Sequence, residues 1–154
     1  MKVENFLQGW LRHRLVLHEL VELIDNQHVN FKPWDKALSM GTLAVHTASA
    51  TDMFVKAVKN GVFAPPRTKN EFQTMDEVRD IIFQLTEVTK EDLLSLTDDQ
   101  LEKELNFNNY IGKGSLWISM AKDHEIHHKG QLFTYARMVG VDNLPFFVKK
   151  LETQ

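Results

Sequence analysis

Apolar residues recur every three or four positions along four long stretches of this chain, and this spacing constrains its fold more than any other feature. A period of about 3.6 residues places the apolar side chains of each stretch on one face of an α-helix. The four stretches cover approximately residues 4–24, 39–59, 74–88 and 115–139. Because no convincing set of strands accompanies them, the pattern predicts an all-α bundle.

Short polar motifs mark where these helices begin and end. Residues 74–77 and 97–100 fit the capping box, in which a Thr hydroxyl and a Glu or Gln side chain satisfy each other's backbone donors. Gly61 and Gly140 stand where helices commonly stop. Residues 106–114 alternate aromatic and polar side chains, which favours a short strand or an extended loop before the last helix.

Length and composition exclude several classes of protein. The 154 residues predict one domain over residues 1–154. The absence of cysteine excludes disulfides, thiolate metal sites and a cysteine nucleophile. A net charge of −3 argues against a nucleic-acid partner. Neither a signal peptide nor a membrane span is evident, so we expect no membrane contact and a cytoplasmic protein.

Three of the seven histidines lie on the apolar faces of two predicted helices. His124 and His128 are one helical turn apart, which is the spacing by which helical histidine pairs bind zinc. His46 lies in the middle of the apolar stripe of the second helix. A buried ring without a partner costs about 1–3 kcal/mol, and a shared metal ion would satisfy all three rings. The alternative is that each ring bonds a backbone carbonyl or a nearby hydroxyl.

The segment from His124 to His128 also matches the H-E-x-x-H pattern of zincin proteases, with Glu125 as the general base. The wider context of those enzymes is missing, because Gln131 and Thr134 occupy the positions of the extended motif. A zincin protease is therefore not expected. Helix geometry places Glu125 about 100° from His124, so Glu125 could instead be a solvated helix residue.

Two segments resemble signatures of the DinB/YfiT-like family. Residues 124–132, HEIHHKGQL, resemble its H-x-x-H-H-R-G-Q-hydrophobic motif, and residues 40–46, MGTLAVH, resemble its second-helix motif ending in His. Lys129 stands where Arg is usual, which keeps the charge but loses bidentate bonding. The resemblance covers nearly the whole chain. It implies an up-down-down-up four-helix bundle, commonly a homodimer, and a divalent metal ion held by His46, His124 and His128.

Three neutral imidazoles leave a metal ion with its full charge and an open position, which is typical of catalytic sites. The expected ion is Zn²⁺ or Ni²⁺. Similar proteins include thiol S-transferases, so the first hypothesis is transfer of a small-molecule thiol to a small electrophile. Hydrolysis by metal-bound water is the second hypothesis, with Glu125 as the candidate base. The third is a non-catalytic stress protein that binds a metal or ligand.

The remaining candidates have smaller roles. His13 is a candidate to line the pocket. Gln131 is expected either to support a metal ligand or to pack against another helix, and His127 either to support a ligand or to lie at the surface. His18 and His28 are expected at the surface or at helix caps. We expect Trp34, Trp117 and Tyr135 to be core residues. Because glycine weakens a helix by about 1 kcal/mol relative to Ala, we expect Gly130 to mark a close helix contact, within the bundle or across a dimer.

Overall fold

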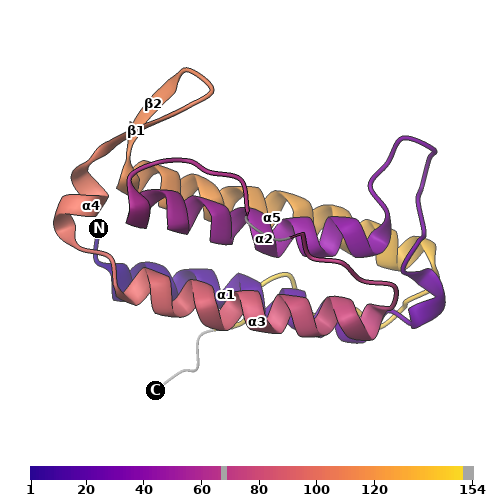
Figure 1. Ribbon diagram of the computed structural model, residues 1–154. Coiled ribbons are helices and arrows are strands. Elements are labelled where there is room, and N and C mark those ends of the chain that lie inside the picture. The colour runs from indigo at the N-terminus through magenta and orange to yellow at the C-terminus, as the bar shows by residue number, and fades with distance from the viewer. Residues whose placement is uncertain (67–68, 151–154) are drawn as a thin grey trace.

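The computed structural model describes residues 1–66 and 69–150, and these form four long helices with a small hairpin (Figure 1). The elements in chain order are α1 (Val3–Glu22), the 3₁₀ turn η1 (Asn26–His28), α2 (Met40–Asn60), α3 (Met75–Leu94), α4 (Asp98–Glu102), β1 (Glu104–Phe107), β2 (Tyr110–Lys113) and α5 (Gly114–Met138). The predicted long helices match these bounds within two residues, except that α3 runs on past Val88 to Leu94.

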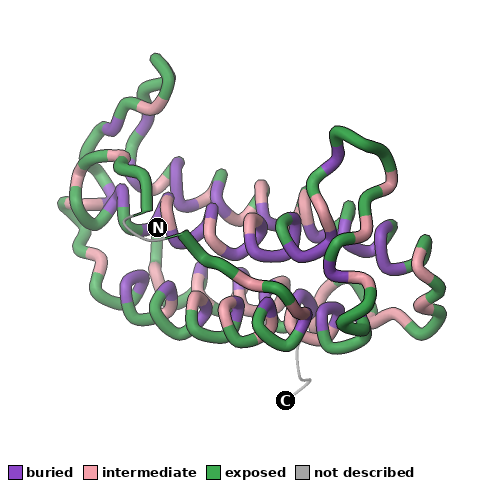
Figure 2. Tube along the Cα trace, turned by 45° about the vertical axis from the view of Figure 1, so that its right-hand side comes forward, coloured by how far each residue is buried: buried purple, intermediate pink, exposed green. Residues whose placement is uncertain are grey.

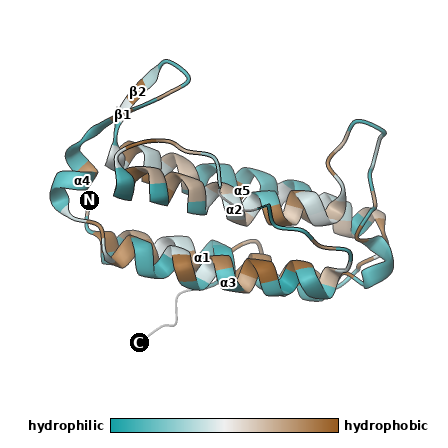
Figure 3. Ribbon diagram, viewed as in Figure 1, coloured by the Kyte–Doolittle hydropathy of each residue, from teal (hydrophilic) through white to brown (hydrophobic). Residues whose placement is uncertain are grey.

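Helices α2 and α5 pack side by side, as do α1 and α3, and α2 also packs against α3 (Figure 1). Helices α2 and α3 run in the same direction, opposite to α1 and α5, so the segment between them crosses the length of the bundle (Figure 1). This is the predicted up-down-down-up arrangement. Each long helix carries both hydrophobic and hydrophilic residues along its length, as an amphipathic pattern requires (Figure 3).

The predicted end signals are confirmed by the hydrogen bonds at the helix ends. Thr74 with Glu77, and Thr97 with Gln100, form complete capping boxes. Gly61 and Gly140 adopt φ values of 77° and 95°, a left-handed region that glycine enters without steric cost.

The extended segment before the last helix is an antiparallel hairpin that pairs Glu104 with Lys113 and Phe107 with Tyr110. Its two turn residues, Asn108 and Asn109, both have positive φ, the conformation that two-residue hairpin turns demand. The hairpin projects at one end of the bundle, beside α4 (Figure 1).

Helix α2 is the most enclosed of the long helices, with 14 of its 21 residues buried (Figure 2). Two hydrophobic clusters surround it, one toward each end of the bundle.

Trp117 and Tyr135 are buried as predicted. The prediction for Trp34 is wrong, because this residue lies in the loop before α2 and is 62% exposed. Within the described ranges, no helix combines the length and hydropathy that a membrane span requires.

Glycine permits close approach at two positions other than the predicted one. A Cβ on Gly41 would lie 2.4 Å from the Phe72 ring, and one on Gly114 would lie 2.4 Å from the carbonyl oxygen of Gln100. Gly130, by contrast, is exposed, and no atom of residues 1–66 and 69–150 would come within 4 Å of its Cβ. The predicted contact within the bundle is therefore wrong, while a contact across a homodimer stays a prediction.

Candidate metal site

His46, His124 and His128 come together between α2 and α5, the pair of helices that pack most extensively against each other. Each ring offers one nitrogen, and the three nitrogens lie within 4.8 Å of one another. The ring centroids are 5.1 Å apart for His46 and His124, 4.8 Å for His46 and His128, and 4.3 Å for His124 and His128. All three side chains are half-buried, so a small molecule could reach the group from solvent.

The ring nitrogens of the cluster lie close enough together that they could share one metal ion. Nδ1 of His128 lies 2.7 Å from Oε1 of Gln131, which leaves Nε2 of His128 facing His124 at 3.0 Å. A hydrogen bond of this kind fixes the tautomer and orientation of a ligating imidazole. The predicted contact of Gln131 with a cluster histidine is thus present. Nδ1 of His124 is buried and has no hydrogen-bond partner among the described residues, so the protein leaves this one ring nitrogen unsatisfied.

Two of the three rings, His46 and His124, have lowered pKa values, which favours the neutral form that binds metal ions. Burial, followed by the nearby rings of His128 and His46, lowers the pKa of His124 to about 4. Burial and the neighbouring His128 also lower the pKa of His46. Because only a neutral imidazole can donate its lone pair to a cation, both effects favour metal binding at neutral pH.

Glu125 is not the solvated residue that helix geometry allowed, because its side chain is fully buried. Arg14 Nε donates to Oε1 at 2.7 Å, and Arg14 Nη2 donates to Oε2 at 2.9 Å. Trp10 Nε1 and Thr51 Oγ1 also donate to Oε2, each at 2.8 Å. With both oxygens engaged in a buried ion pair, Glu125 lacks the free, accessible oxygen that a general base requires.

The bonds around Glu125 extend to all four long helices. Arg14 on α1 also donates to Thr86 on α3 at 3.0 Å and to the Ala48 carbonyl on α2 at 3.4 Å. His18, expected at the surface or a cap, is instead half-buried and bonds Thr86 at 2.8 Å. We call Trp10, Arg14, Thr51, Thr86 and Glu125 the Glu125 network. The sequence feature that could have predicted this network is Arg14, a charged residue on the apolar stripe between Trp10 and Leu17.

Lys129, which directly follows His128, is a further buried charged residue, with only 2% of its surface exposed. Its Nζ lies 2.9 Å from Nδ1 of His13 and also donates to the Phe147 carbonyl, so it ties α5 to α1 and to the segment after α5. Burial lowers the pKa of Lys129 to about 8. Burial, followed by the Lys129 charge, lowers the pKa of His13 to about 4. His13, a candidate to line the pocket, therefore serves as an acceptor for Lys129.

The buried contact of His13 makes stability depend on pH. Between pH 6.5 and about 4 the unfolded chain protonates this ring while the native chain does not, so the free energy of unfolding falls as pH falls. His13→Gln, which keeps an acceptor for Lys129, is expected to reduce this loss by about 1–3 kcal/mol after allowance for partial exposure. Urea unfolding of the wild type and the variant at pH 7, 5.5 and 4 measures how the free energy of unfolding changes with pH. His28→Gln, on η1, is the control, and an unchanged pH slope in His13→Gln would contradict the expectation.

The other histidines lie outside the cluster. His127 is exposed, which agrees with the surface alternative, and its ring centroid lies 4.8 Å from that of His128. His28 is partly exposed on η1 and contacts the neighbouring Gln27 side chain.

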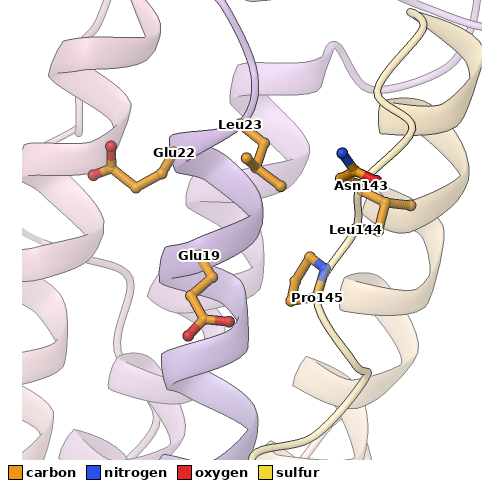
Figure 4. A pocket seen from close by; sticks show the side chains of 6 residues that line it. All are labelled: Glu19, Glu22, Leu23, Asn143, Leu144 and Pro145. Atoms are coloured by element: carbon orange, nitrogen blue, oxygen red, sulfur yellow. The ribbon is translucent and has the colours of Figure 1, made fainter.

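A cavity of about 430 Å³ lies between the end of α1 and the segment after α5, and it includes none of the cluster histidines (Figure 4). It is lined by Glu19, Glu22, Leu23, Asn143, Leu144 and Pro145. The two glutamates point away from each other (Figure 4). Glu19 pairs with Lys149. The cavity therefore lacks converging polar groups.

Four long helices with a small hairpin and a three-histidine cluster define a DinB-type helical bundle. The family model of the DinB family matches residues 1–153, and the chain belongs to this family. Among its relatives is the uncharacterized protein YjoA of Bacillus subtilis (strain 168), which is 33% identical over 150 residues, or 96% of this chain and 97% of YjoA.

Solved structures agree with this assignment. The crystal structure of the DinB-like YjoA from Bacillus subtilis matches with a TM-score of 0.85 and 30% identity, over 95% of this chain and 99% of that one. A DinB-like protein from Bacillus cereus ATCC 10987 matches with a TM-score of 0.78 and 19% identity, over 93% and 95% of the two chains. At that identity the second match supports the fold alone.

Proposed function

We propose that this protein binds one divalent metal ion through His46, His124 and His128 and uses it to transfer a small-molecule thiol to a small electrophile. The observation that carries the proposal is the convergence of three ring nitrogens within 4.8 Å from two helices. Zn²⁺ and Ni²⁺ are the proposed ions, because imidazole nitrogen suits both. The unpartnered Nδ1 of His124 supports the view that the cluster is built for a ligand.

Three neutral imidazoles suit thiol chemistry because they leave the charge of the ion uncompensated and one position open. A divalent ion bound there supplies the positive charge that lowers the pKa of an incoming thiol. The sulfur then bonds to an electrophilic carbon, the leaving group departs with its bonding electron pair, and the thiol proton passes to solvent. No protein nucleophile takes part, which suits a chain without cysteine.

Aromatic rings adjoin the cluster on the side of the hairpin. The Phe54 ring meets His124 edge-on at 6.5 Å and stacks on Trp117 at 5.9 Å. The Phe63 and Phe107 rings pack against Phe54 in turn. This apolar surrounding supports an electrophile with an apolar body, because burial of apolar surface contributes about 25 cal/mol per Å².

The hydrolytic alternative loses its candidate base, since both oxygens of Glu125 already accept hydrogen bonds. Nothing in the described site favours water over a thiol as the nucleophile. A metal-binding protein without catalytic activity is the remaining alternative, and the experiments below separate it from an enzyme.

Metal content is the first test. The purified, untagged protein is expected to hold about one divalent ion per chain, and His46→Ala and His128→Ala are expected to hold none, because two imidazoles leave too few ligands. Elemental analysis measures the content. His127→Ala is the matched control, because this exposed ring lies beside the cluster without belonging to it. Metal retained in both cluster variants would overturn the site.

Activity is the second test, made with protein loaded with Zn²⁺ or Ni²⁺, a panel of low-molecular-weight thiols and an electrophile with an apolar body. Thiol loss that needs the metal and disappears in His128→Ala supports the transferase. Metal binding without transfer across the panel would support the non-catalytic alternative.

A further inference from the structure

We infer that the Glu125 network sets the position of α5 against α1 and α2, and that this position is what makes the three histidines converge. Glu125 and Arg14 are thus positioning residues for the metal site. The inference rests on the proposed metal-binding function, and it assigns a role to buried groups that the proposed chemistry does not use.

The network contacts the helices on both sides of the cluster. Glu125 directly follows His124 on α5, and its carboxylate accepts a bond from Thr51, which lies five residues after His46 on α2. The same carboxylate accepts bonds from Trp10 and Arg14 on α1. The helices that carry the ligands are therefore bonded to each other, and to a third helix, within about two turns of the ligands.

Directional bonds restrict helix position more strongly than apolar contacts do. An N–H···O bond weakens steeply outside a donor–acceptor distance of about 2.7–3.2 Å and below an angle of about 120°. Apolar cores tolerate repacking with small losses as long as volume is kept. Four donated bonds of 2.7–2.9 Å converge on one carboxylate here, so a shift of α5 along or around its axis would break several at once.

Burial keeps these bonds intact in the native state. Arg14 and Glu125 both have side chains with no exposed surface, so solvent cannot replace a partner that moves away. A guanidinium is not deprotonated in proteins, so loss of a proton offers no relief if the pair is broken. The ion pair therefore fits only one arrangement of α1, α2 and α5, and in that arrangement the cluster nitrogens lie within 4.8 Å of one another.

The test replaces the ion pair by apolar residues of similar volume, Arg14→Met with Glu125→Leu. Exchanging a complete buried ion pair for well-packed apolar groups commonly preserves folding. The double variant is expected to fold and unfold cooperatively in urea, yet to bind Zn²⁺ about tenfold or more weakly in calorimetric titration. A folded double variant whose Zn²⁺ affinity stays within about twofold of the wild type would overturn the inference.

Two threonines on α2 offer a milder matched pair, which covers the case of a double variant that does not fold. Thr51 and Thr47 are both fully buried, but Thr51 bonds Glu125 whereas Thr47 bonds only the Leu43 carbonyl of its own helix. Thr51→Val is expected to weaken Zn²⁺ binding several-fold, and Thr47→Val to leave it unchanged. Equal effects of the two substitutions would overturn the positioning role.

A structural readout separates this inference from the proposed function. If the wild type does not bind Zn²⁺, the metal site fails, and metal-free crystal structures of the wild type and variants then decide the positioning role. The His46 and His124 ring centroids, 5.1 Å apart, are expected to shift by about 1 Å or more in the double variant, or in Thr51→Val if the double variant does not fold. Unchanged ring positions would overturn the positioning role of the Glu125 network.

Discussion

Glu125→Leu alone is expected to lower the free energy of unfolding by about 3–5 kcal/mol. The substitution removes the carboxylate that accepts two bonds from Arg14, and it leaves that guanidinium buried. Its remaining hydrogen-bond acceptors are then the Thr86 hydroxyl and the Ala48 carbonyl at 3.4 Å, beside the Trp10 ring face at 4.7 Å. Because a guanidinium cannot lose its proton, the full cost of an unpaired buried charge falls on the native state. Urea unfolding followed by circular dichroism measures the change.

Asp123→Ala is the matched control for this substitution. Asp123 also lies on α5, two residues earlier, but its side chain is exposed. Surface substitutions of this kind usually change stability by no more than about 0.5 kcal/mol. If Glu125→Leu were as stable as Asp123→Ala, water or a rearranged side chain would have to neutralise Arg14, and the account of the buried ion pair would be wrong.

Zn²⁺ is expected to raise the free energy of unfolding by about 2.7 kcal/mol at a free concentration of 100 times its Kd. The three nitrogens lie together only when α2 and α5 are packed, so the ion binds the native state in preference to the unfolded one. Urea unfolding with buffered Zn²⁺, and again with a chelator, measures the difference. His124→Ala is expected to abolish it.

The control for the metal experiment is the protein without metal. His124→Ala and the wild type are compared in chelator first, so that a loss of packing is separated from a loss of binding. His127→Ala is expected to retain the full stabilisation by Zn²⁺. A Zn²⁺ effect of equal size in His124→Ala would place the ion elsewhere on the chain.

Local signals explain why the helices were predicted well. The capping boxes at Thr74 and Thr97 involve residues three apart, and Gly61 and Gly140 need only their own backbone geometry. The i, i+4 spacing of His124 and His128 is local in the same sense. That His46 joins this pair could be predicted because a histidine on an apolar stripe needs a polar partner.

Long-range pairing explains what the sequence did not predict. Glu125 and Arg14 are 111 residues apart, and Lys129 and His13 are 116 apart, so no spacing rule connects them. A Glu or Lys on a helix is usually solvated, and its burial follows only from the partner that another helix provides. Arg14 on the apolar stripe of α1 was the one visible signal. Trp34 was misjudged because loops can expose even large apolar rings.

The burial of Glu125 also changes how the alternatives are tested. The H-E-x-x-H match makes Glu125→Gln the direct test of hydrolysis, because it would remove the candidate base. In the structure the same substitution disturbs a buried ion pair, so a loss of activity would report on structure as well as on proton transfer. Metal content and thiol specificity separate the hypotheses more cleanly.

The burial of α2 affects which parts of the bundle are expected to open locally and exchange their amide hydrogens with solvent. Fourteen of the 21 residues of α2 are buried, against ten of the 25 residues of α5. Backbone amides in so enclosed a helix exchange with solvent mainly through global unfolding, whereas exposed helix faces open in small local fluctuations. His46 therefore belongs to the slowly exchanging part of the molecule. Local opening is therefore expected mainly along α5, which supplies the other two histidines.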